Sequence, residues 1–149
     1  MKVIEYFETD NQEYWLSKIK ECDWSAGKFL FELIKKNEVI KLLGQNTKLL
    51  LLTNDLELIS FCTLSDIDDI ETAELTPWIG FVYTFPKYRG NRYIGKLLSY
   101  AIESAKSNGF TNVYISTDQE GIYEKYGFTF LKIMKDRRAE DSRVYTKVL

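Results

Sequence analysis

Apolar residues recur along this chain with two different spacings, and the change from one to the other divides it into strands and helices. Short apolar or alternating runs bounded by turn residues predict strands, whereas apolar residues at i, i+3, i+4 and i+7 predict helices. We expect strands at residues 2–7, 47–53, 56–64, 77–85, 112–117, 128–135 and 141–149. We expect helices at residues 10–24, 26–37, from near Asn91 to residue 107, and 119–127. The acidic residues 65–75 have no clear period and are predicted to form a loop.

The helix that ends at residue 107 has the most regular pattern. Its apolar positions are Ile94, Leu97, Leu98, Ala101, Ile102 and Ala105, and Asn108 with Gly109 supplies a stop signal. A long helix between the fourth and fifth predicted strands is typical of a parallel crossover connection. The order of the elements therefore predicts an α/β fold with a mixed sheet flanked by helices.

Composition limits the chemistry that the chain can perform. With 149 residues, 45% of them hydrophobic, we expect one domain that spans residues 1–149. There is no histidine, and Cys22 and Cys62 lack the spacing of metal ligands, so we expect no metal site and no Ser/His/Asp triad. The longest aliphatic run, residues 49–52, is far shorter than the ~20 residues that span a bilayer. We expect a soluble cytoplasmic protein that does not enter a membrane.

The segment PKYRGNRYIGKLL, residues 86–98, concentrates positive charge in a chain of formal net charge -2. Its cations are Lys87, Arg89, Arg92 and Lys96, and they lie around Gly90 and Gly95 at the start of a helix. The first amides of a helix are unpaired, and the helix dipole attracts anions to that end. Glycines allow a close backbone approach, and arginines bind phosphate oxygens with two hydrogen bonds. The segment therefore predicts a pyrophosphate site.

Two other interpretations of this segment remain. It can be an ordinary solvated helix start with a glycine turn, although cations at this end oppose the helix dipole. It can also bind nucleic acid, but the sequence pI is ≈ 5.3 and no second stretch is strongly basic. We therefore expect no nucleic-acid partner.

Three features together resemble the GNAT superfamily of acyl-CoA-dependent N-acetyltransferases. They are the segment from Pro86 to Leu98, the strand PWIGFVYTF before it, and YEKYGF at residues 123–128. The order of the predicted elements is similar to that of the family over nearly the whole chain. The resemblance implies a mostly antiparallel sheet in which the fourth and fifth strands form a splayed parallel pair. In the family the motif Q/R-x-x-G-x-G/A wraps the coenzyme A pyrophosphate; here Arg89 takes its first position, Arg92 and Ile94 replace its small residues, and Gly95 follows one residue late.

The resemblance also implies a set of site residues. Backbone groups at the end of the fourth strand would hold the acetyl thioester and pantetheine of acetyl-CoA, which is a co-substrate. The cofactor-binding residues implied are Val82, Tyr83, Thr84, Arg89, Gly90, Asn91, Arg92, Tyr93, Ile94, Gly95 and Lys96. An asparagine that often precedes the family tyrosine is not evident here; Ser116, Thr117 and Asp118 are the local candidates.

The family motif Y-x-x-x-G-F implies that Tyr123 is catalytic. Its hydroxyl would protonate the departing coenzyme A thiolate, a transfer that requires the site to tune the pKa of one of the two groups. Tyr126 lies three residues further on and is the nearest competitor for this role. The alternative is that both tyrosines only pack beneath the last strands.

The attacking amine must lose a proton before it reacts with a thioester, which calls for a base or a chain of water molecules. The loop before the fourth strand holds Asp66, Asp68, Asp69, Glu71 and Glu74. Such acids could attract a cationic amine and accept its proton, although each one alone reads more simply as a solvated loop residue. Glu74 is our candidate catalytic base because it lies nearest the strand.

We therefore expect an N-acetyltransferase that moves acetyl from acetyl-CoA to a primary amine by direct attack in a ternary complex. The amine acceptor would be a small molecule or a protein, and whether the chain forms a homodimer is left open. The alternative is a noncatalytic acyl-CoA or nucleotide binding module that regulates a partner.

Overall fold

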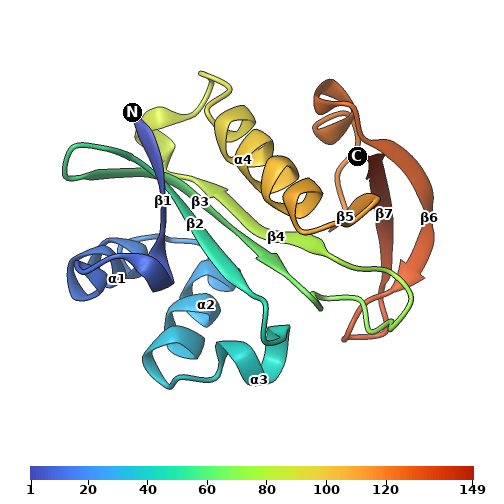
Figure 1. Cartoon of the computed structure of the whole chain (residues 1–149), viewed down its shortest axis with the longest axis horizontal. Helices are drawn as coiled ribbons and strands as arrows, with labels where there is room; N and C mark the ends of the chain where they lie inside the picture. Colours follow the sequence, from blue (N-terminus) through green and yellow to red (C-terminus); the bar gives the residue numbers. More distant parts are fainter.

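A seven-stranded mixed sheet with helices on both faces makes up the structure, a computed structural model that describes residues 1–149 (Figure 1). The strands are β1 (Lys2–Glu5), β2 (Lys48–Asn54), β3 (Glu57–Ser65), β4 (Trp78–Thr84), β5 (Asn112–Thr117), β6 (Thr129–Lys135) and β7 (Asp141–Val148). The α-helices are α1 (Gln12–Lys20), α2 (Ser25–Lys35), α3 (Val39–Leu43) and α4 (Ile94–Ser107). Three short 3-10 helices are η1 (Tyr6–Glu8), η2 (Pro86–Tyr88) and η3 (Tyr123–Tyr126).

The strand order in the sheet is β1-β2-β3-β4-β5-β7-β6, and β4 with β5 is the one parallel pair. The crossover that joins this pair contains α4, as the sequence predicts. The α/β class, the mostly antiparallel sheet and the splayed parallel pair are all confirmed.

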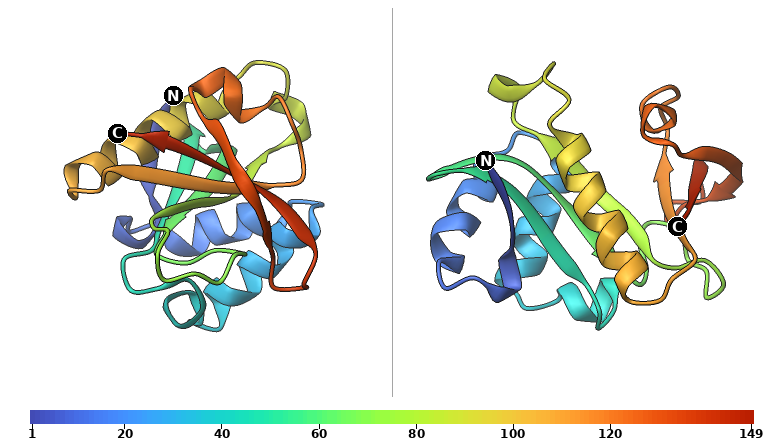
Figure 2. Two further views of the ribbon diagram at one scale, coloured as in Figure 1. Left: turned by 90° about the vertical axis from the view of Figure 1, so that its right-hand side faces the viewer. Right: turned by 45° about the horizontal axis from the view of Figure 1, so that its top comes forward.

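Each face of the sheet is covered by its own helices. The apolar stripe of α2, which includes Leu30, Leu33 and Ile34, packs against Phe61 and Tyr83 on one face. On the opposite face Leu97 and Leu98 of α4 pack in a second cluster of buried residues. Figure 1 shows α1, α2 and α3 on one side of β1–β4 and α4 on the other. Figure 2 shows β5–β7 as a separate group of strands beside α4.

Several elements differ from the sequence-based expectation; for example, β1 ends at Glu5 rather than residue 7, and α1 is shorter than the expected 10–24. The helix of the basic segment begins at Ile94 rather than near Asn91, because residues 89–93 form a loop with left-handed backbone at two positions. The short helix α3 was not predicted. The helix expected over residues 119–127 is only the 3-10 helix η3, which ends at Gly127 in the left-handed region.

Candidate active site

The parallel strands β4 and β5 pair over only two residues of each strand. Trp78 lies opposite Tyr114 and Ile79 opposite Ile115, and the pairing stops there. Strand β5 continues to Thr117 against β7, while β4 continues to Thr84 against β3. The edge of β4 that faces β5 is therefore without a partner strand from Gly80 onward, and its backbone polar groups, apart from the Thr84 carbonyl that accepts from Arg89, remain available to a ligand.

A bulge lies in β4 just beyond this point. Thr63 of β3 pairs with Gly80 but Phe61 pairs with Tyr83, so β4 holds one extra residue between these pairs. Within the bulge, Phe81 has a φ of 50°, in the left-handed region that residues other than glycine rarely adopt. Bulges re-aim backbone groups and are common beside active sites.

A cavity of about 410 Å³ opens at the divergence of the two strands. It is lined by Asp23, Trp24, Val82, Tyr83, Thr84, Arg89 and Gln119. Four of these were predicted from the sequence, and the structure brings them together in this cavity. Asp23 and Trp24, from the loop between α1 and α2, and Gln119, from the loop after β5, were missed. A second cavity of about 490 Å³, which Glu5, Asn46 and Phe110 help to line, contains Asp66 of the acidic loop but none of the residues expected to bind the cofactor or to be catalytic.

Aromatic and charged side chains form one wall of the β4 cavity. The Trp24 ring stacks on the Tyr83 ring with 5.6 Å between centroids, and the Tyr83 hydroxyl donates to Asp23 at 2.9 Å. Burial, and then the hydrogen bond to Asp23, raises the pKa of Tyr83. The Arg89 guanidinium lies 5.4 Å from the Tyr83 ring centroid, and its Nε donates to the Thr84 carbonyl at 2.9 Å. The terminal nitrogens of Arg89 remain free for a second ligand.

The loop before α4 presents five consecutive free amides. None of the main-chain N–H groups of residues 90–94 donates a hydrogen bond within the chain, whereas those of Gly95 and Lys96 bond back to Arg92 and Tyr93 at 3.1 Å. Gly90 and Arg92 have φ values of 86° and 57°. Left-handed and right-handed residues in succession turn several N–H groups toward one point and form an anion-binding nest. An anion bound here would depend on the backbone as much as on the side chains.

The side chains of this loop have several environments. Arg89, Arg92 and Lys96 are exposed, and Asn91 donates to the Tyr88 carbonyl at 3.1 Å, which fixes the loop. Lys87 is held in an ion pair with Glu57 at 3.3 Å. A Cβ at Gly95 would lie 3.1 Å from Cε1 of Tyr126, so the glycine lets that ring pack on the first turn of α4.

Tyr123 lies in η3 with its side chain 8% exposed. Its ring contacts Phe128 edge to face at 6.1 Å, and its hydroxyl makes no hydrogen bond within the chain yet is not sealed from solvent. Burial, followed by the nearby Cys62 thiol and Asp68 carboxylate, raises the pKa of Tyr123 well above its usual value. The phenol therefore stays protonated and keeps a proton to donate.

The acids of the loop before β4 differ sharply in burial. Glu74, the base predicted from the sequence, is exposed, and its main-chain N–H donates to the Thr72 hydroxyl at 3.2 Å. Asp66 accepts hydrogen bonds from the main-chain and side-chain nitrogens of Asn46. Asp68 is only 7% exposed, and burial raises the pKa of its carboxyl to about 7. Nothing in the sequence distinguishes Asp68 from its acidic neighbours.

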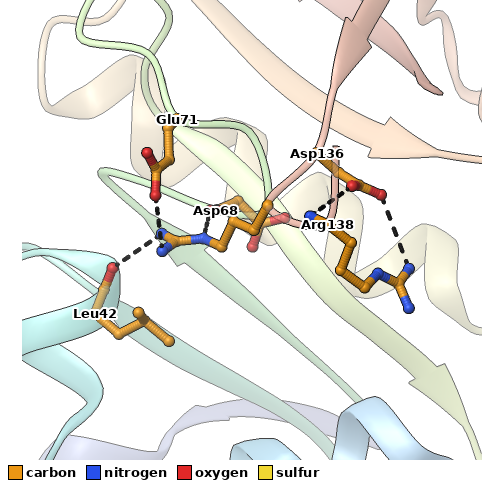
Figure 3. Close-up of polar contacts among 6 residues, drawn as sticks. Leu42, Asp68, Glu71, Asp136 and Arg138 are labelled. Atoms are coloured by element: carbon orange, nitrogen blue, oxygen red, sulfur yellow. Dashed lines mark hydrogen bonds and ion pairs between the residues drawn. The ribbon is translucent and has the colours of Figure 1, made fainter. Parts of the chain in front are cut away.

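Arg137, in the connection between β6 and β7, holds the acidic loop in place. In Figure 3 it is the unlabelled side chain joined by dashed lines to Leu42, Asp68 and Glu71. Its Nε donates to the main-chain carbonyl of Asp68 at 3.1 Å, and its Nη1 lies 3.5 Å from a Glu71 oxygen. Nη2 donates to the Leu42 carbonyl of α3 at 3.5 Å. One guanidinium therefore ties the β3–β4 loop to two distant parts of the chain.

Two further structural facts concern the site and the helices. No group of three or more His, Cys, Asp or Glu side chains is arranged to hold a metal ion. The helices are all too short or too polar to cross a membrane.

Comparison with known families identifies this arrangement. The model of the acetyltransferase (GNAT) family matches residues 4–128, which include β4, the amide loop and η3. The chain belongs to the GNAT acetyltransferase family. This confirms the resemblance seen in the sequence and makes the protein an acyltransferase. No curated protein sequence matches the chain significantly.

Solved structures share the GNAT fold over the whole chain. An acetyltransferase from Streptococcus agalactiae is 22% identical, with a TM-score of 0.67 and coverage of 99% of this chain and 98% of that one. A GNAT family acetyltransferase from Elizabethkingia anophelis with acetyl-CoA bound is 18% identical, with a TM-score of 0.68 and coverage of 99% and 97%. The aminoglycoside 6'-N-acetyltransferase from Enterococcus faecium is 12% identical, with a TM-score of 0.70 and coverage of 99% and 97%.

Proposed function

We propose that this GNAT protein transfers the acetyl group of acetyl-CoA to a primary amine by direct attack in a ternary complex. The observation that carries the proposal is the state of Tyr123: its ring is buried in the same cluster as Ile79 of β4, and its hydroxyl stays protonated, has no partner within the chain and still meets solvent. A module that only bound acyl-CoA would not need a proton donor there.

We propose two sites for the cofactor. The free amides of residues 90–94, with Arg89, suit the two negative charges of a pyrophosphate. The free edge of β4 at Val82, Tyr83 and Thr84 offers main-chain groups to the amides of the pantetheine arm, apart from the Tyr83 and Thr84 carbonyls, which accept from Ser60 Oγ and Arg89 Nε. Because Arg89 already bonds the Thr84 carbonyl, it stands where these two sites meet.

The proposed chemistry needs one proton to leave the acceptor and one to reach the thiol. The neutral amine attacks the thioester carbonyl carbon, and the tetrahedral intermediate collapses with cleavage of the C–S bond. Tyr123 donates its proton to the departing thiolate and recovers one from solvent or from the new amide nitrogen. A positioned acid of this kind contributes roughly 10²- to 10⁴-fold to the rate.

We propose that the acceptor is a cationic amine that enters on the side of Asp23 and Trp24. A carboxylate beside a stacked pair of aromatic rings is an environment that attracts ammonium groups. One of the structures that this chain is similar to is an aminoglycoside 6'-N-acetyltransferase, which fits an amine acceptor. Asp23 would hold the acceptor, while the thioester would lie further along β4.

Thiol release from acetyl-CoA in the presence of a panel of amines tests this function. The panel contains polyamines, aminoglycosides, lysine and peptides with a free amino terminus, and mass spectrometry identifies the acetylated product. We expect thiol release that depends on an amine. If acetyl-CoA binds but no amine supports thiol release, the chain is the noncatalytic module instead.

A further inference from the structure

The Asp68 carboxyl packs against the backbone of β4 at Gly80, where β4 and β5 diverge. A Cβ on Gly80 would lie 2.7 Å from the carboxyl carbon of Asp68, so only glycine leaves room for this group. Gly80 is also the first residue of β4 beyond Ile79, the last one paired with β5. The carboxyl therefore lies at the inner end of the free edge that would hold the thioester.

The face of the sheet on which Asp68 lies follows from the strand register. Gly80 pairs with Thr63, and residues directly opposite each other in an antiparallel pair project to the same face. The neighbours Cys62 and Ile79 belong to the buried cluster on the α4 face, as does Tyr123. Asp68 and Tyr123 are thus on opposite sides of β4, and a thioester at its free edge would lie between them.

A second polar group on this face is without a partner. Thr63 Oγ1 is the one buried polar side-chain atom that has neither a hydrogen bond nor contact with solvent. A buried hydroxyl without a partner is costly and often marks a place where a ligand or a water molecule belongs. Because Thr63 lies opposite Gly80, its hydroxyl is on the same face of the sheet as the Asp68 carboxyl.

The charges that face the Asp68 carboxyl act in opposite directions, and burial is the largest influence on its pKa. The main-chain N–H of Asp69 is the hydrogen-bond donor that faces it; the Asp69 carboxylate repels its negative charge, and Arg137 from the β6–β7 connection attracts it. From the α4 face it interacts with Tyr123, which stays neutral, and Cys62 beside that tyrosine is a buried thiol with a raised pKa. Burial therefore dominates and makes this carboxylate more basic than an exposed one.

We infer that Asp68 is the catalytic base that takes the proton from the ammonium group of the acceptor, an inference that rests on the proposed function. The amine approaches on the face of Asp23, Trp24 and Thr63, and the thiol leaves toward Tyr123 on the other. We take Asp68 in place of Glu74, the base expected from the sequence, since Glu74 is exposed whereas the Asp68 carboxyl is buried against Gly80 of β4.

The proton balance is complete without another reactant. The Asp68 carboxylate takes a proton from R–NH₃⁺ and becomes a carboxylic acid, and R–NH₂ attacks the thioester carbon. The C–N bond forms and the C–S bond breaks, the thiolate takes its proton from Tyr123, and the nitrogen loses its second proton to Tyr123 or to solvent. Asp68 then releases its proton to solvent, which gives the amide, the free thiol and one proton.

The test is the pH dependence of kcat/KM for the acceptor at saturating acetyl-CoA, measured by thiol release with the full chain. For the wild type we expect activity to fall as the pH is lowered through about 7, the pKa raised by burial. Asp68→Asn keeps the size of the side chain. The variant should no longer show this fall of kcat/KM at low pH, and its kcat should be lower by roughly 10²- to 10⁴-fold. Glu74→Gln is the matched control and should behave like the wild type.

A comparison of weakly and strongly basic acceptors shows whether Asp68 acts as a base or only supports the structure. Trifluoroethylamine is already neutral at pH 8 and needs no base before attack, so Asp68→Asn should lose far less activity with it than with a strongly basic alkylamine. Equal losses with both amines would contradict the inference.

Other outcomes are equally decisive. If the Asp68→Asn variant keeps the wild-type rate and the wild-type loss of activity at low pH, this inference alone is overturned. If none of the amines tested supports thiol release by the wild type, the proposed function is overturned as well. If the variant does not fold, ¹³C NMR of the wild type labelled at aspartate Cγ decides the matter. One carboxyl that titrates close to pH 7 supports the inference, and titration of all of them below pH 5 overturns it.

Discussion

The amide loop of residues 90–94 and the buried pair formed by Asp68 and Tyr123 lie near the same strand, but they are built in opposite ways. The loop is largely exposed and presents free main-chain N–H groups together with the exposed cations Arg89, Arg92 and Lys96 around it. Asp68 and Tyr123 are buried, each contributes one titratable group, and burial raises the pKa of both groups. The loop would act through main-chain amides, whereas Asp68 and Tyr123 would act through the protons of their side chains.

This difference predicts different sensitivities. An anion bound by several amides and cations loses only part of its binding energy when one side chain is removed, and added salt weakens the rest. A proton transfer depends on a single atom, so one substitution removes the whole contribution, and pH rather than salt controls it. Changes at the buried pair should therefore affect turnover more than any change in the loop.

The largest effect is expected for Tyr123→Phe. The ring and its contact with Phe128 remain, while the proton donor is lost. We expect kcat to fall by roughly 10²- to 10⁴-fold with unchanged affinity for coenzyme A. Steady-state kinetics and calorimetry measure the two quantities.

Tyr126→Phe is the control for this experiment. The Tyr126 ring packs on Gly95 at the start of α4, and its hydroxyl has no assigned role. Wild-type activity is expected. If Tyr126→Phe is inactive while Tyr123→Phe is fully active, the motif register is wrong by three residues.

Asp68→Asn should also change the pH dependence of stability. Burial raises the pKa of this carboxyl from 3.8 to about 7, so the folded state keeps a proton that the unfolded chain releases. The stabilising contribution is complete below about pH 4 and is lost as the pH rises through 7. Between pH 5 and 7 the wild type should lose roughly 1.4 kcal/mol per pH unit relative to Asp68→Asn. Urea unfolding at several pH values measures this difference, and parallel curves would contradict the raised pKa.

A smaller effect is expected for Arg89→Ala in the amide loop. Loss of its charge-assisted hydrogen bonds should weaken coenzyme A binding by roughly 10- to 100-fold, and the salt dependence of binding should decrease. Lys87→Ala is the matched control because Lys87 is engaged by Glu57. Isothermal titration at two salt concentrations measures both, and equal losses for the two variants would mean that only net charge matters.

The smallest effect is expected for neutralising the rim of the cavity. Asp23 is exposed, so Asp23→Asn should raise the KM of a cationic acceptor by only a few-fold and leave the KM of acetyl-CoA unchanged. Steady-state kinetics at low and high salt check this. A raised KM for acetyl-CoA instead would move Asp23 into the cofactor site.

The sequence predicted the parts of the site that depend on local pattern. The strand β4 and the helix α4 follow from period and turn residues, and the cations with glycines at their junction indicated an anion site. The sequence did not show that the helix starts at Ile94 and that the loop before it turns its amides together, because this depends on the backbone of Gly90 and Arg92.

The parts that sequence missed depend on distant contacts. Asp68 is buried because Gly80 leaves room for it and because Arg137, 69 residues away, holds its loop. Asp23 joins the cavity through a hydrogen bond from Tyr83, 60 residues away. Glu74 is nearest the strand in sequence, yet it is exposed, since distance along a loop does not determine which side chain turns inward.

The central claim is that one ligand occupies both the amide loop and the free edge of β4. Backbone amide NMR of the 17.5 kDa chain, titrated with coenzyme A and with pantetheine, tests it most directly. We predict that coenzyme A shifts the resonances of residues 90–94 and of Val82 to Thr84, and that pantetheine, which lacks the pyrophosphate, binds far more weakly and shifts only those of β4. Coenzyme A that binds while the resonances of residues 90–94 stay unchanged would contradict the account.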